Sequence, residues 1–374
     1  MCEHMDISTP KNKPVLFLIN GLGRGGAEKV FMEQAVALHE MGLPVYFGSL
    51  YGSSSTEGLL AGTGVSADHS VTFDFKKFLD LRGFLNLRRF VAKNKISIVY
   101  STLEEANTIT RLLKISKPSI RVITRESNDA SGKLWKFKIL DVGLNFFTDK
   151  IIAVSRGVKD SLKRYQGIHA DKIIVVENGI NVSRDDFEIL FKQKPKDAIN
   201  ILSVGSLTKQ KNQRFLIKAF GEALGELPQT ATLTIVGAGS LRGELEDFVK
   251  KSNLVGRVFL AGPVDRAKMK DFFIDSHIFI LPSLWEGCPN ALLEAMSYGL
   301  PAISTRVSGA EDIIEDGVSG FLVGVNNIDL VGRKIVQLAL DGKLRHDMGL
   351  AARRRIGDKY SFNKNINNLI SILL

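Results

Sequence analysis

The sequence lacks the features that mark exported or membrane-spanning proteins. Among its 374 residues only Cys2 and Cys288 are cysteines, too few for a disulfide framework, so a reducing compartment is favoured. No run of 18 apolar residues occurs, and Glu3 and Asp6 stand where a signal peptide needs basic and then apolar residues. We therefore expect a cytoplasmic protein that neither spans a membrane nor is secreted.

Motifs for metal binding and for nucleophilic catalysis are also missing. The six histidines show no ligand spacing, and the sequence has no Asp-x-Asp triplet and no Gly-x-Ser-x-Gly elbow. The sequence therefore predicts no metal site and no bound cofactor.

An excess of acidic residues is absent too, since 50 Lys and Arg stand against 40 Asp and Glu, a formal net charge of +10. The excess is concentrated between Lys76 and Lys138, with fifteen basic and five acidic residues. Such a region attracts polyanions or an anionic membrane surface, and the alternative is the solvated face of a basic protein.

Strand-like apolar runs alternate with amphipathic segments along the chain, which is typical of parallel sheets covered by helices. In the first half the runs are 15–19, 44–50, 96–100, 120–124, 151–154 and 173–176; in the second half they are 201–204, 233–236, 258–260, 278–281, 302–304 and 321–323. A helix is expected over Glu28–Met41, with Val30, Phe31, Gln34, Ala35 and Leu38 on one face.

The polar segment 191–200, which contains Pro195, separates the two series. We therefore expect an α/β protein of two domains, residues 1–192 and 193–374, whose facing strand ends form a ligand cleft. A last helix, at about 361–374, has apolar positions that need a partner surface.

The first strand leads into Gly21-Leu-Gly-Arg-Gly-Gly26, a match to the dinucleotide-binding pattern. That use requires an acidic residue about 20 positions on, and Tyr46–Tyr51 contains none. Dinucleotide binding is therefore disfavoured. Gly25 and Gly26 instead offer backbone amides at a helix start to a phosphate or sugar oxygen.

In the second half, Lys209 and Lys211 follow a strand beside an expected helix start, where positive charge can stabilise a phosphate. The alternative is that both lysines only solubilise a loop. A further turn, with Gly237 and Gly239, follows the next strand.

The strongest signal is the segment Leu281–Gly299. A buried strand ends, Glu286 stands in a loop, Pro289 suits a first helical turn and Gly299 closes the helix. Glu294 falls inside that helix among apolar neighbours. The two carboxylates can hold two groups of an extended ligand, with the amides of Asn290 and Ala291 between them.

Five motifs together resemble the GT-B retaining glycosyltransferases of family 4, over about residues 14–355. They are Glu286 with Glu294, Gly25–Glu28, Ala153–Ser155, Glu177–Ile180 and Ser283–Gly287. The resemblance implies two Rossmann-like domains facing each other across a cleft, with the C-terminal helix crossing back to the first domain. It also implies sugar transfer from a UDP- or GDP-linked donor with retention, commonly without a metal.

By position, the resemblance assigns Glu286 to the donor sugar hydroxyls, Glu294 to the ribose diol and Lys211 to the diphosphate. Glu286 and Lys211 are the expected catalytic residues. Ser206 stands where the family commonly has an arginine, so more of the leaving-group charge falls to Lys211. The full expected donor-binding set is Gly25, Gly26, Ser206, Lys211, Gly237, Gly239, Glu286, Gly287, Cys288, Pro289, Asn290, Ala291 and Glu294.

Thr124–Asn128 resembles an acceptor-side segment of relatives that act on lipid-linked sugars, so Arg125 and Glu126 are acceptor-side candidates. A basic surface with interleaved apolar residues would suit anionic headgroups on the inner face of a membrane. Its residues are Lys76, Lys77, Arg88, Arg89, Lys133, Leu134, Trp135, Lys136, Phe137 and Lys138. The alternative is a helix packed on the sheet by its apolar side.

The hypothesis is a metal-independent retaining glycosyltransferase that uses a UDP-sugar and a lipid-linked or cell-surface glycan acceptor, with no nucleic-acid partner. Three alternatives stay open: a GT-B enzyme acting on a soluble sugar, an NAD-dependent oxidoreductase, and a non-catalytic polyanion-binding protein.

Overall fold

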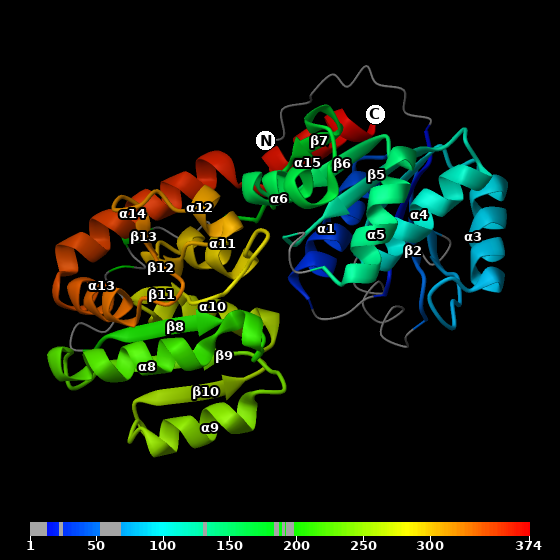
Figure 1. Ribbon diagram of the computed structural model, residues 1–374. Helices are drawn as coiled ribbons and strands as arrows, with labels where there is room; N and C mark the ends of the chain where they lie inside the picture. The colour runs from blue at the N-terminus through cyan, green and yellow to red at the C-terminus, as the bar shows by residue number, and fades with distance from the viewer. Residues whose placement is uncertain are drawn as a thin grey trace. The chain divides into compact units, whose positions relative to one another are not determined.

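The computed structural model describes residues 13–21, 25–52, 69–129, 133–182, 187–188, 191 and 198–374, without the side chain of Lys136. The chain forms two compact units (Figure 1). Unit 1 comprises Met1–Gly179 and Asn363–Leu374, and unit 2 comprises Ile180–Phe362. Within the described ranges, no helix is both long and apolar enough to cross a lipid bilayer.

Unit 1 is built on a seven-stranded parallel sheet in the order β3-β2-β1-β4-β5-β6-β7. Its strands are β1 (Val15–Ile19), β2 (Val45–Ser49), β3 (Ser70–Thr72), β4 (Ile98–Thr102), β5 (Arg121–Glu126), β6 (Lys150–Ala153) and β7 (Ile173–Val175). Val15 of the central β1 pairs with Val45 on one side and Ile98 on the other. Both faces of this sheet are covered, so β1 is buried along its whole length.

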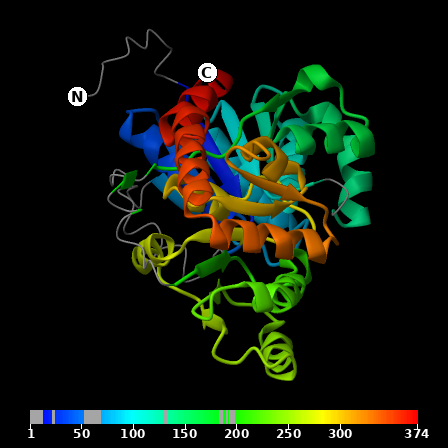
Figure 2. The same ribbon diagram turned by 90° about the vertical axis from the view of Figure 1, so that its left-hand side faces the viewer.

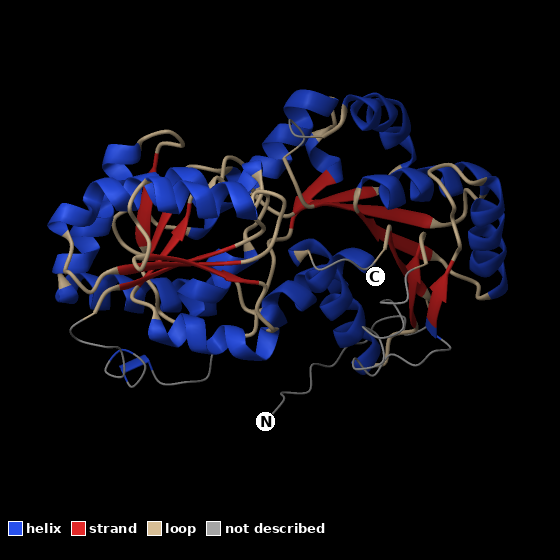
Figure 3. Ribbon diagram, turned by 90° about the horizontal axis from the view of Figure 1, so that it is seen from below, coloured by secondary structure: helices blue, strands red, loops and turns tan. Residues whose placement is uncertain are grey.

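Helices cover both faces of each sheet, as Figure 3 shows with strands in red and helices in blue. Those of unit 1 are α1 (Gly26–Glu40), α3 (Leu81–Lys93), α4 (Glu104–Ser116), α5 (Trp135–Leu144), α6 (Arg156–Gln166) and α15 (Phe362–Leu373), with short 3₁₀ turns η3 (Asn145–Phe147) and η4 (Ala170–Lys172). α1 buries the five residues predicted from its spacing, which confirms that helix. α6 begins where the Ser155 hydroxyl accepts from the Val158 amide and ends at left-handed Gly167.

α15 belongs to unit 1 although it ends the chain, because buried Asn365 ties it there. The Asn365 side chain accepts a hydrogen bond from Gln34 Nε2 of α1 at 2.8 Å and donates to the carbonyl oxygen of Glu177. At its other end, Arg121 Nη1 donates to the Leu373 carbonyl oxygen at 3.0 Å.

Unit 2 holds a six-stranded parallel sheet in the order β10-β9-β8-β11-β12-β13. Its strands are β8 (Asn200–Val204), β9 (Thr232–Val236), β10 (Val258–Gly262), β11 (Ile278–Leu281), β12 (Ala302–Thr305) and β13 (Gly320–Val323). The strand order reverses between β8 and β11, which makes that point the natural ligand-binding position of such a sheet.

The helices of unit 2 are α8 (Gln213–Ala223), α9 (Arg242–Lys251), α10 (Arg266–Asp275), α11 (Asn290–Ser297), α12 (Ser308–Ile313), α13 (Ile328–Leu340) and α14 (Gly342–Lys359), with 3₁₀ turns η5 (Lys209–Lys211) and η6 (Leu224–Glu226). β10 is an edge strand, and α9 lies beside it at the lower end of Figures 1 and 2. Two apolar clusters, one on each side of the sheet, form the core of the unit.

Each predicted apolar run is confirmed as a strand, and β3 is the strand that the prediction missed. The chain passes from unit 1 to unit 2 between Gly179 and Ile180, ahead of the polar segment expected as the boundary. Ile180 belongs to unit 2 because its amide donates to the Tyr360 carbonyl and its carbonyl accepts from the Phe362 amide. Much of that polar segment lies outside the described residues.

Candidate functional site

Most of the predicted site residues of unit 2 lie in loops that follow the carboxyl ends of β8, β9 and β11. These strands run parallel, so their following loops meet at one edge of the sheet. The loops after β8 and β11 flank the point where the strand order reverses. Lys211 comes from the first of these loops and Glu286 from the second.

Lys211 is the last residue of the η5 turn, and only Asn212 separates it from α8. Its aliphatic stem packs over Gly205, where an added Cβ would lie 3.3 Å from Lys211 Cδ. Asn212 takes a left-handed conformation, with φ of 50°, and turns the chain into α8. The lysine is thereby directed to Glu286, and its Nζ forms an ion pair with Glu286 Oε1.

Glu286 is 6% exposed and is held by a fixed loop. Ser283 Oγ donates to Glu286 Oε1 at 2.6 Å, and the Ser283 carbonyl accepts from Thr305 at the end of β12. The loop is joined to η5 twice: the Leu284 amide donates to the Gln210 carbonyl at 2.8 Å, and Gln210 Nε2 donates to the Trp285 carbonyl at 2.9 Å. The two loops therefore form one rigid support for the Lys211–Glu286 pair.

The glycines of this edge allow backbones to approach one another. Gly237 has a φ of +146°, and a Cβ there would collide with the Gly205 carbonyl. A Cβ on Gly239 would collide with the Leu207 backbone, whose amide donates to Ala238 at 2.9 Å. The Gly287 carbonyl is likewise closely approached by Gly309. These contacts within the protein explain the glycines without a ligand.

α11 starts at Asn290 directly after this loop, with Pro289 as the residue that caps it. The Pro289 carbonyl accepts from the Leu292 amide at 3.1 Å. Cys288 and Ala291 are half-buried against the apolar core. Glu294 lies one turn into the helix and is half-buried between fully buried neighbours.

Ser206 is exposed, and its hydroxyl lies 3.5 Å from that of Thr208. Its carbonyl oxygen accepts from Gln213 Nε2 at 2.8 Å, so the backbone at this position is fixed by α8.

Gly25 and Gly26 belong to unit 1, where Gly25 precedes α1 and Gly26 begins it. The Glu28 carboxylate lies against Gly25 and would collide with a Cβ there. The intervening residues 22–24 of the glycine motif lie outside the described residues.

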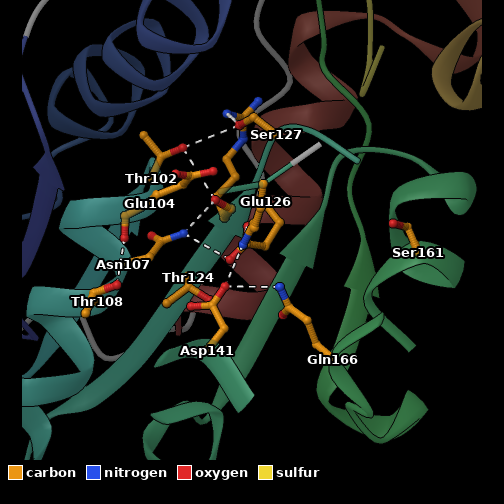
Figure 4. A network of polar contacts seen from close by, with 12 residues as sticks. Thr102, Glu104, Asn107, Thr108, Thr124, Glu126, Ser127, Asp141, Ser161 and Gln166 are labelled. Atoms are coloured by element: carbon orange, nitrogen blue, oxygen red, sulfur yellow. Dashed lines mark hydrogen bonds and ion pairs between the residues drawn. The ribbon is translucent and has the colours of Figure 1, made fainter. Parts of the chain in front are cut away.

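Arg125 and Glu126, the acceptor-side candidates, end β5 and are almost fully buried. Arg125 donates to Ser127 Oγ at 2.8 Å and to Asn178 Oδ1 at 2.5 Å. Glu126 accepts from Asn107 Nδ2 at 3.1 Å (Figure 4). It also pairs with two cations. Both residues also line a cavity of unit 1.

The buried network around Glu126 contains three charged residues that sequence reasoning did not assign to it: Arg111, Lys133 and Asp141. Lys133 Nζ lies 2.7 Å from Glu126 Oε2 and 2.8 Å from Asp141 Oδ2, while Arg111 pairs with both carboxylates. Gln166 Nε2 donates to Asp141 at 3.0 Å. Two cations thus face two carboxylates in the interior. The signal that could have identified Arg111 was a charge between Ile109 and Leu113, two apolar residues of the buried side of α4.

The structure corrects two residues of the expected basic surface. Lys133 is only 7% exposed and Phe137 only 3%, because the first joins the ion network and the second packs in the core. Burial disfavours the Lys133 charge, but Glu126 and Asp141 outweigh it and raise the pKa of its ammonium group. Leu134 and Trp135 are exposed, as expected, and so are Lys76, Lys77, Arg88 and Arg89.

Two family models match the chain in succession. Glycosyltransferase Family 4 matches residues 24–184, and Glycosyl transferases group 1 matches residues 185–355.

Curated relatives carry related names. The UDP-Gal:alpha-D-GlcNAc-diphosphoundecaprenol alpha-1,3-galactosyltransferase of Escherichia coli is 26% identical over 242 residues, 62% of this chain and 62% of that protein. The amylovoran biosynthesis glycosyltransferase AmsK of Erwinia amylovora is 30% identical over 213 residues, 55% of this chain and 52% of that protein. The matched part spans less than two thirds of the length of these relatives.

Among solved structures, Alr3699/HepE of Anabaena in complex with UDP superposes with a TM-score of 0.83. The match covers 96% of this chain and 99% of that chain at 18% identity, a likeness of fold.

Proposed function

Because the chain belongs to the group 1 glycosyltransferases and has their GT-B fold, we propose that it transfers a sugar from a UDP-sugar to a glycan or lipid-linked glycan acceptor, with retention. The Lys211–Glu286 pair, held at the point where the strand order reverses, carries this proposal. The UDP bound to the Anabaena protein supports the choice of nucleotide, and the name of the Escherichia coli relative supports the acceptor class.

Lys211 and the start of α11 serve the leaving group. When the bond between the sugar carbon and the phosphate oxygen breaks, negative charge builds on the diphosphate. The Lys211 ammonium group and the amides of the first turn of α11 are fixed positive groups that stabilise this charge more than the ground state. The departing phosphate oxygen takes the acceptor proton on the same face while the acceptor oxygen bonds to the sugar carbon. This route uses no metal and no protein base.

Glu286 and Glu294 hold the two ends of the donor. Both contacts of Glu286 use Oε1, and among the described residues none donates a hydrogen bond to Oε2. That oxygen therefore remains to accept hydrogen bonds from donor sugar hydroxyls. Glu294, half-buried one turn further along α11, accepts from the ribose diol. Ser206, Gly237, Gly239 and the Gly287–Ala291 backbone complete the proposed donor site of unit 2. Gly25 and Gly26 of unit 1 stay separate candidates for a phosphate or sugar oxygen.

A lipid-linked acceptor is membrane-bound, so contact with an anionic membrane from its cytoplasmic side is part of the proposal. Trp135, Ile139 and Val142 repeat at helical spacing on α5 and are exposed, and Phe146 follows at 81% exposed. We call these four residues the α5 apolar face. Lys172 lies 5.7 Å from the Phe146 ring, which supports a cationic surround suited to anionic headgroups. A soluble sugar acceptor, the alternative, would need no such contact.

Substitutions at the donor site test the proposal. Glu294→Ala removes a charged hydrogen-bond acceptor and is expected to weaken UDP binding about tenfold or more, measured by calorimetry. Lys211→Ala is expected to lower the rate at which UDP is formed from the UDP-sugar by about 100-fold. The assay uses the UDP-sugar that gives the largest thermal shift with the wild type.

The matched control is Lys209→Ala, which removes an exposed lysine of the same turn and should leave both quantities unchanged. Near-normal binding and turnover in both site variants would refute the site. If Lys209→Ala lost as much UDP binding and turnover as Lys211→Ala, the effect would come from net charge and not from the site.

A further inference from the structure

Glu286 has a second partner besides Lys211, and this partner belongs to its own loop. Ser283 Oγ donates to Glu286 Oε1 at 2.6 Å, and the same oxygen pairs with Lys211 Nζ. Ser283 is fully buried, so water does not compete for its hydroxyl. Two donors therefore converge on one carboxylate oxygen, one from a buried serine and one from a lysine at the edge of the sheet.

Ser283 is itself fixed by the neighbouring strand. Its carbonyl oxygen accepts a hydrogen bond from the hydroxyl of Thr305, which ends β12 and is 1% exposed. The same Thr305 hydroxyl lies 3.4 Å from the carbonyl oxygen of Leu281, which ends β11. Because β11 and β12 are paired, two strands of the sheet set the position of the Ser283 hydroxyl.

A bound diphosphate would act differently on the two partners of Glu286. The Lys211 side chain is 21% exposed, and its ammonium group has three protons to donate. A diphosphate carries more negative charge than one carboxylate, so it competes with Glu286 for this ammonium group. The Ser283 hydroxyl has a single proton, which is directed at Oε1 in the interior. Ser283 is therefore the partner that Glu286 keeps when the donor binds.

We propose that Ser283 is a positioning residue for Glu286. Its hydroxyl holds Oε1 while Lys211 turns to the diphosphate, so that Oε2 stays directed at the hydroxyls of the donor sugar. Among the described residues none donates a hydrogen bond to Oε2, so the orientation of the carboxylate depends on the contacts at Oε1. Ser283→Ala then weakens the contact with the sugar and spares those with the nucleotide. This role rests on the proposed glycosyltransferase function.

Ser283→Ala is tested by calorimetry with two ligands, UDP and the UDP-sugar that gives the largest thermal shift with the wild type. UDP has no sugar for Glu286 to hold, so its dissociation constant should change less than about twofold. The dissociation constant of the UDP-sugar should rise about tenfold, the usual effect of losing a hydrogen bond to a charged group. The matched control is Ser276→Ala, which removes a buried serine hydroxyl ahead of β11 and should leave both constants unchanged.

A double variant distinguishes positioning from a general structural use. Because Ser283 acts through Glu286, adding Ser283→Ala to Glu286→Ala should leave UDP-sugar binding as it is in Glu286→Ala alone. Circular dichroism melting checks that each variant is folded.

Thr305 gives a second test that leaves Ser283 in place. Thr305→Val removes the hydroxyl that holds the Ser283 carbonyl, so it should weaken UDP-sugar binding more than UDP binding. Thr305→Ser keeps a hydroxyl and should bind the UDP-sugar more tightly than Thr305→Val does. Equal UDP-sugar binding by the wild type and Thr305→Val would count against the proposed support of Ser283.

Three results would overturn the role of Ser283. Ser283→Ala could bind the UDP-sugar as well as the wild type does, it could lose UDP and the UDP-sugar equally, or it could weaken UDP-sugar binding further in Glu286→Ala. Absent UDP binding in the wild type would instead refute the glycosyltransferase function. Normal UDP binding with an unchanged UDP-sugar constant in Ser283→Ala would refute the positioning role alone.

Discussion

Lys133 and Lys211 both pair with carboxylates, and their surroundings give them different uses. The Lys133 side chain is 4% exposed and contacts two carboxylates, so no bound ligand can take it over without breaking the network. The Lys211 side chain is 21% exposed and contacts one carboxylate at a sheet edge, so a diphosphate can share it. The first lysine is structural, and the second is the one we propose for chemistry.

Replacing Lys133 with methionine tests its structural use. The change leaves Glu126 and Asp141 with one cation fewer in the interior, which is expected to cost about 3–5 kcal/mol of unfolding free energy. Thermal melting should therefore show a clearly lower transition in Lys133→Met. The control, Lys138→Met, changes a half-buried lysine of α5 and should melt near the wild type. Equal melting of the two variants would mean that the Lys133 network contributes little.

These residues show where sequence reasoning stops. The position of Glu286 in a loop after a buried strand, and of Glu294 inside the next helix, could be predicted because both follow from local pattern. The burial of Lys133 could not, because its partners Glu126 and Asp141 come from other elements and a basic run reads as a surface.

At the scale of elements, strand prediction succeeded wherever an apolar run was long enough. β3 was missed because Ser70–Thr72 has three residues and one apolar side chain, and its pairing with β2 decides its conformation. Two of the motifs that carry the family resemblance also have structural uses that their spacing does not reveal. Ser155 caps α6, and Asn178 accepts a hydrogen bond from Arg125.

α14 is joined to the segment after Ile180 through His346. His346 Nδ1 lies 3.2 Å from Asp347 Oδ1, and His346 Nε2 lies 2.9 Å from Glu188 Oε1. The Phe187 ring packs on the imidazole, with 5.3 Å between the ring centroids. These carboxylates raise the pKa of His346, the hydrogen bond to Asp347 first and that to Glu188 second. The contribution of these contacts to the unfolding free energy is complete below the ordinary histidine pKa of about 6.5. It is lost as the pH rises through the higher pKa of His346 in the folded protein.

We therefore expect the melting temperature of the wild type, relative to that of His346→Gln, to fall as the pH rises above about 6.5. Because solvent screens this partly exposed group, the difference in unfolding free energy between the wild type and His346→Gln stays below about 1 kcal/mol. Exposed His169, changed to glutamine, serves as the control and should follow the wild type. Parallel pH curves for the wild type and His346→Gln would contradict this assignment.

The α5 apolar face also belongs to the scale of elements. Changing Trp135 and Phe146 together to serine removes two exposed rings that would enter a membrane surface. Burial of such side chains is worth about 1.5–3 kcal/mol each, so binding to phosphatidylglycerol-containing vesicles should weaken at least about tenfold in sedimentation. Val255→Ser, at an exposed apolar residue of unit 2, should leave binding unchanged. Equal vesicle binding by all three proteins would refute the membrane contact through this face.

At the scale of the molecule, the two units repeat one arrangement. Each is a parallel sheet whose strand order reverses once, and each presents its candidate site at the loops beside that reversal. Alternating apolar runs were enough to predict this architecture. The candidate site of unit 2 presents Lys211 and the start of α11. The cavity of unit 1 is lined by charges of both signs, which are Glu104, Glu105, Arg125, Glu126 and Lys133. An anionic donor suits the site of unit 2.

The central claim is that unit 2 holds a nucleoside diphosphate between Lys211, the start of α11 and Glu294. A crystal structure of the full chain with UDP tests it most directly. The account predicts diphosphate oxygens within hydrogen-bond distance of Lys211 Nζ and of the amides that open α11, with the ribose hydroxyls on Glu294. UDP bound at the glycine turn of unit 1, with Lys211 and Glu294 left without contact to it, would contradict the account.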